Sequence, residues 1–298
     1  MGLLIAAPTV STQRAGTYPS AVVRRPPLPL LAASLALLAG CALQPRSLDA
    51  LPEAPPASQA ADGPALEERA KQAWAESEAR PDDADVALAA TALLFQAADL
   101  RLQRGSLEAL DALEAPDLAA VLGADERVDD VTREAVLSLC TAGLEAAERA
   151  AALRPGDVAA ELHRGLHLSL VSWANGPARS LMAGYGPRLV AAIDAALAAD
   201  ATFDDAAPLR LDGRFRGKAP WPYGDLARAR ASLERACEAA PITVNLLFLG
   251  DVLWAAGARD EALARWRAAS TAEGDASTRW SQPLLRELAA RRLATATP

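Results

Sequence analysis

The most informative stretch of the sequence runs from Thr243 to Ala269 and reads TVNLLFLGDVLWAAGARDEALARWRAA. Two positions carry small residues, Gly250 and Ala262, and small residues let two helices pack closely. Gly257 lies between them, where a glycine ends a helix. The large side chains that fill the space around the small ones are Leu246, Leu253 and Trp266. The stretch therefore predicts a pair of short helices joined by a turn.

This order of large, small and turn residues, which also includes Leu249, resembles a tetratricopeptide helix pair. Apolar residues recur at helical spacing from Leu66 onward, and Pro or Gly interrupts them at intervals that suit short antiparallel helices. Two predicted apolar faces are Val136, Cys140, Leu144, Ala147 and Ala151, and Leu226, Ala229, Leu233, Ala236 and Ala240. We therefore predict an all-α fold for residues 65–298, with antiparallel helix pairs stacked as a degenerate tetratricopeptide-like α-solenoid.

The composition agrees with a helical chain and excludes one large class of function. Of the 298 residues, 51% are hydrophobic but only 4% are aromatic, so the apolar content is mostly small and helix-favouring. A β-sandwich or barrel would need more valine, isoleucine, threonine and aromatic residues. The chain has 30 basic and 38 acidic residues, a net charge of −8, which disfavours nucleic acid as a partner.

The amino-terminal segment has the order of an export signal. Arg24 and Arg25 precede the short apolar run from Leu30 to Leu38, which is too short to span a bilayer. The run ends in Leu-Ala-Gly-Cys41, which resembles the lipobox of bacterial lipoproteins. We expect a signal peptide over residues 1–40, lipidation of Cys41, and a flexible Pro/Ala-rich tether over residues 41–64. The expected location is periplasmic, with a lipid anchor that attaches the protein to the membrane.

The resemblance to lipoproteins also bears on which membrane carries the anchor. Ala42 follows the cysteine, at a position where an aspartate would favour retention in the inner membrane. The sequence therefore slightly favours the outer membrane and leaves the choice open.

Residue types that often carry chemistry are present without the spacing that chemistry needs. His163 and His167 are one helical turn apart, but no Glu lies between them as in a H-E-x-x-H metalloprotease, so we expect them on a helix surface or at a repeat interface. Cys140 and Cys237 are interpreted as buried thiols, and the sequence leaves open whether they pair. No phosphate-binding loop, dinucleotide fingerprint or nucleophile elbow is present. We therefore predict no enzyme, cofactor or metal site.

The segment around residues 204–241 resembles the T-component family of tripartite ATP-independent periplasmic (TRAP) transporters, which are lipoproteins built from cryptic tetratricopeptide repeats. The helix that carries Leu168, Leu170 and Trp173 before Asn175-Gly176 is similar to that family's tryptophan-bearing helix. In two places the sequence departs from the family pattern: Tyr223 replaces a glycine, and Asp212 a leucine. The residues that carry the resemblance are Pro208, Arg210, Gly213, Phe215, Pro220, Gly224, Asp225, Ala229, Leu233, Ala236 and Pro241.

Five residues are candidates for binding a ligand or a partner. The segment from Gly213 to Asp225 places basic residues beside aromatic ones in an otherwise acidic chain, and this mixture suits a binding rim. The alternative is that Pro220 and Pro222 stiffen a connection whose aromatic residues cover the ends of neighbouring helices. A tryptophan at helical spacing can likewise be core or a ligand platform. The candidates are Trp173, Arg210, Arg214, Trp221 and Tyr223.

The resemblance implies that the mature protein binds the periplasmic substrate-binding protein of a TRAP-type uptake system, together with a small hydrophobic ligand. The first alternative is an envelope assembly scaffold with no small-molecule role. The second is an envelope enzyme with an unrecognised catalytic group. The resemblance also implies trimers, but the sequence shows no feature that demands them, and homo-oligomerisation stays open.

Overall fold

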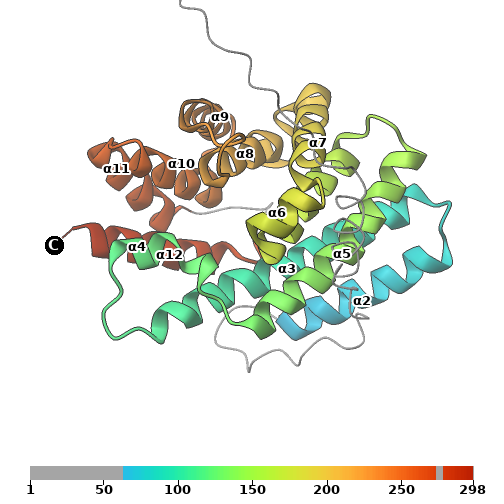
Figure 1. Ribbon diagram of the computed structural model, residues 1–298, viewed down its shortest axis with the longest axis horizontal. Coiled ribbons are helices and arrows are strands. Elements are labelled where there is room, and N and C mark those ends of the chain that lie inside the picture. Colours follow the sequence, from blue (N-terminus) through green and yellow to red (C-terminus); the bar gives the residue numbers. More distant parts are fainter. Residues whose placement is uncertain (1–62, 273–277, 298) are drawn as a thin grey trace, which may run out of the picture. The chain divides into compact units, whose positions relative to one another are not determined.

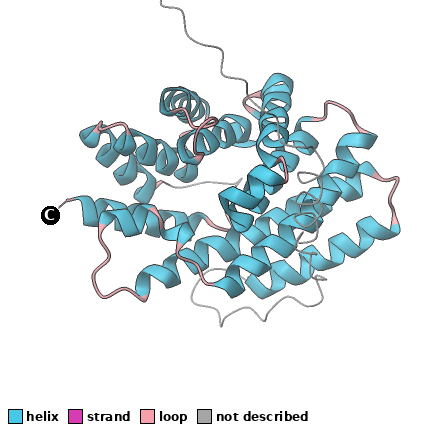
Figure 2. Cartoon of the chain, in the orientation of Figure 1, coloured by secondary structure: helices cyan, strands magenta, loops and turns pink. Residues whose placement is uncertain are grey.

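The computed structural model describes residues 63–272 and 278–297, and within them every regular element is a helix (Figure 2). The predicted signal peptide, Cys41 and most of the predicted tether lie outside the described residues. The first described helix begins at Gly63, two residues before the expected border of the helical domain at residue 65. Gly63 and Pro64 therefore belong to a helix and not to the tether.

The helices pack in adjacent pairs along the chain (Figure 1). Helix α2 packs on α3, α5 on α6, α6 on α7, α8 on α9, and α10 on α11, while α3 also packs along α5. This arrangement confirms the predicted all-α, solenoid-like fold. The elements are α2 (Gly63–Ala79), α3 (Ala84–Asp111), α4 (Leu118–Leu122), the 3-10 turn η2 (Ala124–Glu126), α5 (Asp130–Leu153), α6 (Val158–Met182), α7 (Tyr185–Asp200), α8 (Phe203–Lys218), α9 (Leu226–Ala239), α10 (Thr243–Ala255), α11 (Arg259–Thr271) and α12 (Gln282–Ala296).

The α10–α11 pair has the packing that its sequence predicts. Trp266 is fully buried against Gly250, where an added Cβ would lie 2.5 Å from the indole ring. Only glycine therefore fits at position 250. Gly257 follows α10 with a φ of 84°, which is the left-handed conformation that ends a helix. The indole Nε1 of Trp266 donates to Asp251 at 3.1 Å, so its polar atom is satisfied inside the pair.

The α8–α9 pair follows the same rule but contains a buried charge. An added Cβ on Gly213 would lie 2.4 Å from the Leu233 side chain, so this glycine also permits a close helix contact. Asp212 is 1% exposed and accepts a hydrogen bond of 2.6 Å from Ser232. Arg228 donates to the same carboxylate at 3.1 Å. Aspartate is therefore accommodated where the family resemblance would place a leucine.

The two predicted apolar faces are buried, apart from one end of each. In α5, Ala151 is only half-buried, and in α9 Leu226 is 42% exposed. Leu226 is the first residue of α9 and therefore lies beside solvent instead of between helices. The eight other predicted residues are buried, namely Val136, Cys140, Leu144, Ala147, Ala229, Leu233, Ala236 and Ala240.

Two helices are interrupted, and both interruptions matter for the site described below. Helix α6 is broken at Gly176, which has a φ of 76° and precedes Pro177. Helix α8 begins with a left-handed turn in which Asp204, Asp205 and Ala206 have φ values of 48°, 55° and 61°. Such values are costly for residues with a Cβ. Surrounding contacts must therefore hold this left-handed turn of α8 in place.

His167 lies at a helix interface, which is one of the two positions expected for it. Its Nε2 lies 3.0 Å from the Thr91 carbonyl oxygen, and Thr91 in turn donates to the Gly143 carbonyl. An added Cβ on Gly143 would lie 2.0 Å from the imidazole ring, so the histidine is packed tightly between α3, α5 and α6. In the described residues no three metal-ligating side chains gather.

The two described cysteines are free thiols. Cys140 is buried and Cys237 is half-buried, so only the first is as deeply buried as expected. Burial raises the pKa of both thiols, and that of Cys237 to about 11. Both are therefore protonated near neutral pH. Across residues 63–272 and 278–297, none of the helices combines the length and apolar character needed to cross a bilayer.

Candidate ligand cavity

The described residues border an open cavity of about 1230 Å³. Its wall is built by α3, η2, α5, α6, α7, α8, α10 and α12, together with the connection between α8 and α9 and residues 278–280 before α12. The structure places all five sequence-predicted site residues on this wall, although they come from different elements. They are Trp173 on α6, Arg210 and Arg214 on α8, and Trp221 and Tyr223 on the α8–α9 connection.

Much of the wall is apolar and aromatic. A wall of this kind, with a few placed polar groups, is typical of sites for small molecules. Its volume exceeds the usual range of roughly 300–1,000 Å³ for such sites. The aromatic members are Phe95, Trp173, Phe203, Phe215, Trp221, Tyr223, Phe248 and Trp280.

Trp173 lies where α6 is about to break. It is half-buried and packs at the edge of the core cluster between α3 and α5. The guanidinium of Arg133 on α5 is stacked over its indole, with 4.5 Å between Cζ and the ring centroid. Trp173 is therefore both a packing residue and part of the cavity wall, so both interpretations from the sequence apply to it.

Arg210 stabilises the left-handed turn at the start of α8. Its Nη1 donates to the Asp205 carbonyl and to the Asn245 side-chain oxygen, each at 3.1 Å. Asn245 is fully buried and donates to the same Asp205 carbonyl at 3.1 Å and to the Ala240 carbonyl at 2.8 Å. These bonds hold the strained turn, and the turn places Phe203 and Asp204 on the cavity wall.

Arg214 belongs to a network of ion pairs on the cavity wall. It donates to Asp125 of η2 and to Asp251 of α10, each at 3.2 Å. Lys218 also donates to Asp125 at 3.2 Å, and Arg292 of α12 donates to Asp251 at 3.2 Å. Burial raises the pKa of Asp125, but Arg214 and Lys218 outweigh it and hold the pKa below its usual range. Lys218 also lies 3.8 Å from the Glu126 carboxylate, so three cations of the network face three carboxylates.

The two aromatic residues of the α8–α9 connection differ in environment. Trp221 is 90% exposed, whereas Tyr223 is half-buried. The Tyr223 ring lies against Gly186 at the start of α7, where an added Cβ would be 2.5 Å away. It also packs beside Phe215, with 5.9 Å between ring centroids. Tyr223 thus covers a helix end, as the alternative interpretation predicts, and Trp221 does not.

His163 brings a polar atom to the cavity wall. Its ring lies edge-on to Phe95 at 6.3 Å between centroids. Burial lowers the pKa of His163 to about 4 and that of His167 to about 3, so both are neutral near pH 7. A neutral imidazole offers a ligand one donor or one acceptor without a charge.

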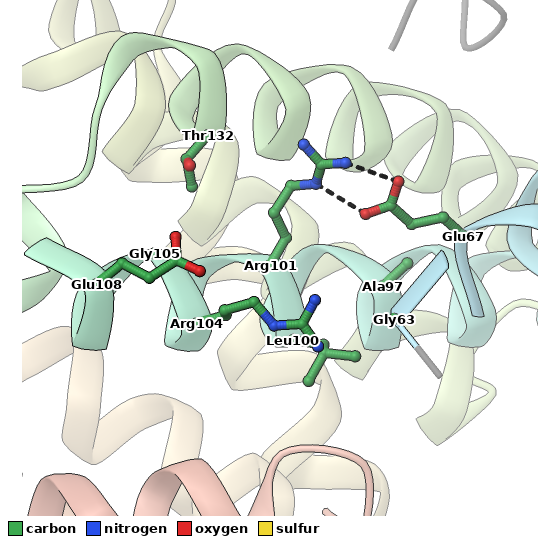
Figure 3. Close-up of a pocket in the computed structure, with 9 residues that line it drawn as sticks. All are labelled: Gly63, Glu67, Ala97, Leu100, Arg101, Arg104, Gly105, Glu108 and Thr132. Atoms are coloured by element: carbon green, nitrogen blue, oxygen red, sulfur yellow. Dashed lines mark hydrogen bonds and ion pairs between the residues drawn. The ribbon is translucent and has the colours of Figure 1, made fainter. Parts of the chain in front are cut away.

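A second cavity of about 20 Å³ lies between α2, α3 and α5 (Figure 3). Arg101 donates to Glu67 through two bonds of 2.7 and 2.8 Å. Beside them, Nε and Nη2 of the buried Arg104 have no hydrogen-bond partner among the described residues. The volume admits about one water molecule, so this cavity is too small for a ligand of the predicted kind.

Several wall residues were not predicted from the sequence. Phe95, Arg133 and Phe248 lie on helices outside the aromatic segment of residues 213–225, and Trp280 lies in the turn before α12. A signal was present for Trp280, because it is one of few aromatic residues in the chain, but tryptophan is more often core. For Arg133 the sequence offers none, since its surroundings are unremarkable helix.

A scan of the sequence against protein-family models found no match, and a search of curated proteins likewise found none.

Proposed function

We propose that the mature protein is a lipid-anchored periplasmic protein that binds a small hydrophobic ligand in the large cavity and docks a partner protein at the cavity rim. The proposed partner is the substrate-binding protein of a TRAP-type uptake system. The observation that carries the proposal is that five residues, selected from the sequence as a binding group, line one cavity. The sequence resemblance to TRAP T-components supports the choice of partner.

The ligand part of the proposal is supported by the chemistry of the wall. Aromatic side chains supply large apolar contact areas, and several of the charged residues are already engaged in ion pairs. A hydrophobic molecule would therefore gain contact area in the cavity without separating many charges.

The partner part is supported by exposed apolar residues near the rim. Trp221 is 90%, Leu181 75% and Met182 65% exposed, and they are the most exposed large apolar side chains in the described part of the chain. Trp221 and Leu181 both line the cavity, and the Tyr223–Gly186 contact joins their segments. Exposed apolar residues that gather in one place are typical of protein-binding surfaces.

The ligand part can be tested with N-phenyl-1-naphthylamine, an uncharged dye that fluoresces when it enters an apolar site. We expect saturable binding to the full-length chain. Ala92→Trp adds bulk to the cavity wall and should weaken binding at least about tenfold, whereas Ala152→Trp, at an exposed position of α5, should leave it unchanged. Equal binding by both variants would refute the cavity as the ligand site.

The partner part can be tested by affinity capture from native membranes, with Cys41→Ala as the control for anchoring. Recovery of a periplasmic substrate-binding protein together with a multi-span permease would support the proposal. Loss of that recovery in Trp221→Ala would assign the rim to the contact. Recovery of outer-membrane assembly or cell-wall proteins would favour the alternative of an envelope scaffold.

A further inference from the structure

Arg133 lies on the cavity wall outside the ion-pair network. Arg214 pairs with Asp125 and Asp251, Lys218 with Asp125 and Glu126, and Arg292 with Asp251. Arg133 is half-buried on the same wall, and its hydrogen bonds in the described residues go only to backbone carbonyls. They join Nη1 to Trp173 at 3.5 Å and Nη2 to Glu126 at 3.3 Å, which are long distances. Its positive charge therefore has no carboxylate partner there.

The position of Arg133 is fixed by its neighbours. Thr132, the residue before it, packs on Gly105 of α3, where an added Cβ would lie 2.9 Å from the threonine methyl group. Trp173 supplies the surface on which the guanidinium is stacked. A guanidinium stacked on an aromatic face keeps its N–H groups at its edge, where they can form paired hydrogen bonds with a carboxylate.

We propose that the hydrophobic ligand of the cavity carries a single carboxylate head group, and that Arg133, stacked on Trp173, binds it. This inference rests on the proposed function, because it assumes that the cavity is a ligand site. A half-buried guanidinium with no anionic partner favours an incoming carboxylate over an uncharged head group. The aromatic wall would contact the apolar part of the same molecule.

Asp99, a carboxylate on the same wall, would favour a cationic head group instead. Asp99 accepts hydrogen bonds from Gln103 at 3.1 Å and from Trp280 at 3.0 Å, and both donors are neutral. A cationic head group would be drawn to Asp99, whereas an anionic one would be repelled by it. The sign of the preferred head group therefore distinguishes Arg133 from Asp99 as the recognition residue.

The test compares three probes with the same twelve-carbon chain: dodecanoate, dodecan-1-ol and dodecyltrimethylammonium, each below its micelle-forming concentration. Their dissociation constants for the full-length chain follow from displacement of N-phenyl-1-naphthylamine. We expect dodecanoate to bind at least about tenfold more tightly than dodecanol, as for a hydrogen bond to a charged group. The readout is the ratio of the two constants, because a general weakening of the cavity cancels in it.

Arg133→Gln keeps a side chain that can donate to the backbone carbonyls but removes the charge, and it should bring the ratio close to one. Arg279→Gln is the matched control, since Arg279 is an exposed cation on the same wall, and it should leave the ratio unchanged. An unchanged ratio in Arg133→Gln would overturn the assignment. So would a wild-type preference for the cationic probe.

The outcomes also separate this inference from the proposed function. If dodecanol binds the wild-type chain as tightly as dodecanoate, the carboxylate inference is wrong and the hydrophobic cavity stands. If none of the three probes binds and the dye does not bind either, the ligand part of the proposed function fails as well.

Discussion

In the α10–α11 pair, Gly250 accepts the indole of Trp266 and no space is left between the helices, whereas α6 and α8 border a cavity of about 1230 Å³. The difference lies in the backbone. Helices α10 and α11 are regular, but α6 is broken at Gly176 and α8 begins with a left-handed turn at Asp204. Both interruptions lie on the cavity wall. Small residues in contact close the α10–α11 interface, and the cavity lies beside the points where α6 and α8 are interrupted.

The largest effect should come from removing a tryptophan on each side of this comparison. Trp266→Ala should lower the free energy of unfolding by about 3–5 kcal/mol, because it removes a fully buried side chain from a closed interface. Trp280→Ala should cost less than half as much, since Trp280 is half-buried beside empty space. Both indoles donate to an aspartate, so the hydrogen bonds are matched. Urea unfolding measures both, and equal losses would contradict the difference in packing.

The next largest effect is the pH dependence of stability caused by His167, which lies in the unbroken first half of α6. The pKa of His167 is lowered by burial to about 3 from the ordinary 6.5. Between these values the unfolded chain binds a proton that the folded chain does not, so stability falls as the pH falls through this window. At pH 5 the loss relative to pH 7 is about 2 kcal/mol for His167. Because the pKa of His163 is lowered to about 4, His163 should add a similar loss over the same interval.

Urea unfolding at pH 7 and pH 5 measures this loss, and His167→Gln should reduce the difference between the two pH values by about that amount. Asp125 does not interfere, because its lowered pKa confines its effect to a more acidic range. A variant that keeps the full pH dependence would show that the buried imidazole is not its source.

These two effects also show how far the sequence could predict the molecule. The closed helix pairs were predictable because their rule is local: Gly250 and Trp266 are close in the chain, and so are Gly213 and Leu233. The break in α6 was signalled by Asn-Gly-Pro at residues 175–177, which suits a turn. The left-handed turn of α8 contains no glycine, and its aspartates, Asp204 and Asp205, tolerate this conformation but also suit the ordinary first turn of a helix.

The candidate site was predictable only in part, for a similar reason. The segment from Gly213 to Asp225 stood out by composition, and its three aromatic residues reach the cavity together with Arg214 and Lys218. Arg133, Phe95 and Phe248 reach it from helices separated by many residues, and a cavity between distant helices leaves no local pattern. That Arg133 has no carboxylate partner among the described residues follows from the ion pairs of the folded chain and not from the sequence.

A smaller effect tests the contacts that hold the left-handed turn of α8. Asn245→Ala should lower the free energy of unfolding by about 1–2 kcal/mol, because it removes buried hydrogen bonds to the Asp205 and Ala240 carbonyls. It should also weaken dye binding in the cavity, since Arg210 loses its side-chain acceptor. Asn175→Ala, beside the break in α6, is the control and should cost less, because its amide is only half-buried. An equal cost in the two variants would mean that Asn245 is not a special support of the turn.

The smallest effect on stability should come from Trp221, and Tyr223 in the same α8–α9 connection is the residue to compare it with. Trp221→Ala should change the free energy of unfolding by less than about 0.5 kcal/mol, because the side chain is 90% exposed. Tyr223→Ala should cost about 1 kcal/mol or more, since that ring packs on Gly186 and beside Phe215. Binding should show the reverse order: an exposed tryptophan that serves as a contact residue is worth more than about 1 kcal/mol of affinity for the partner. If Trp221→Ala left both the free energy of unfolding and the affinity for the partner unchanged, Trp221 would be neither a packing residue nor a contact residue for the partner.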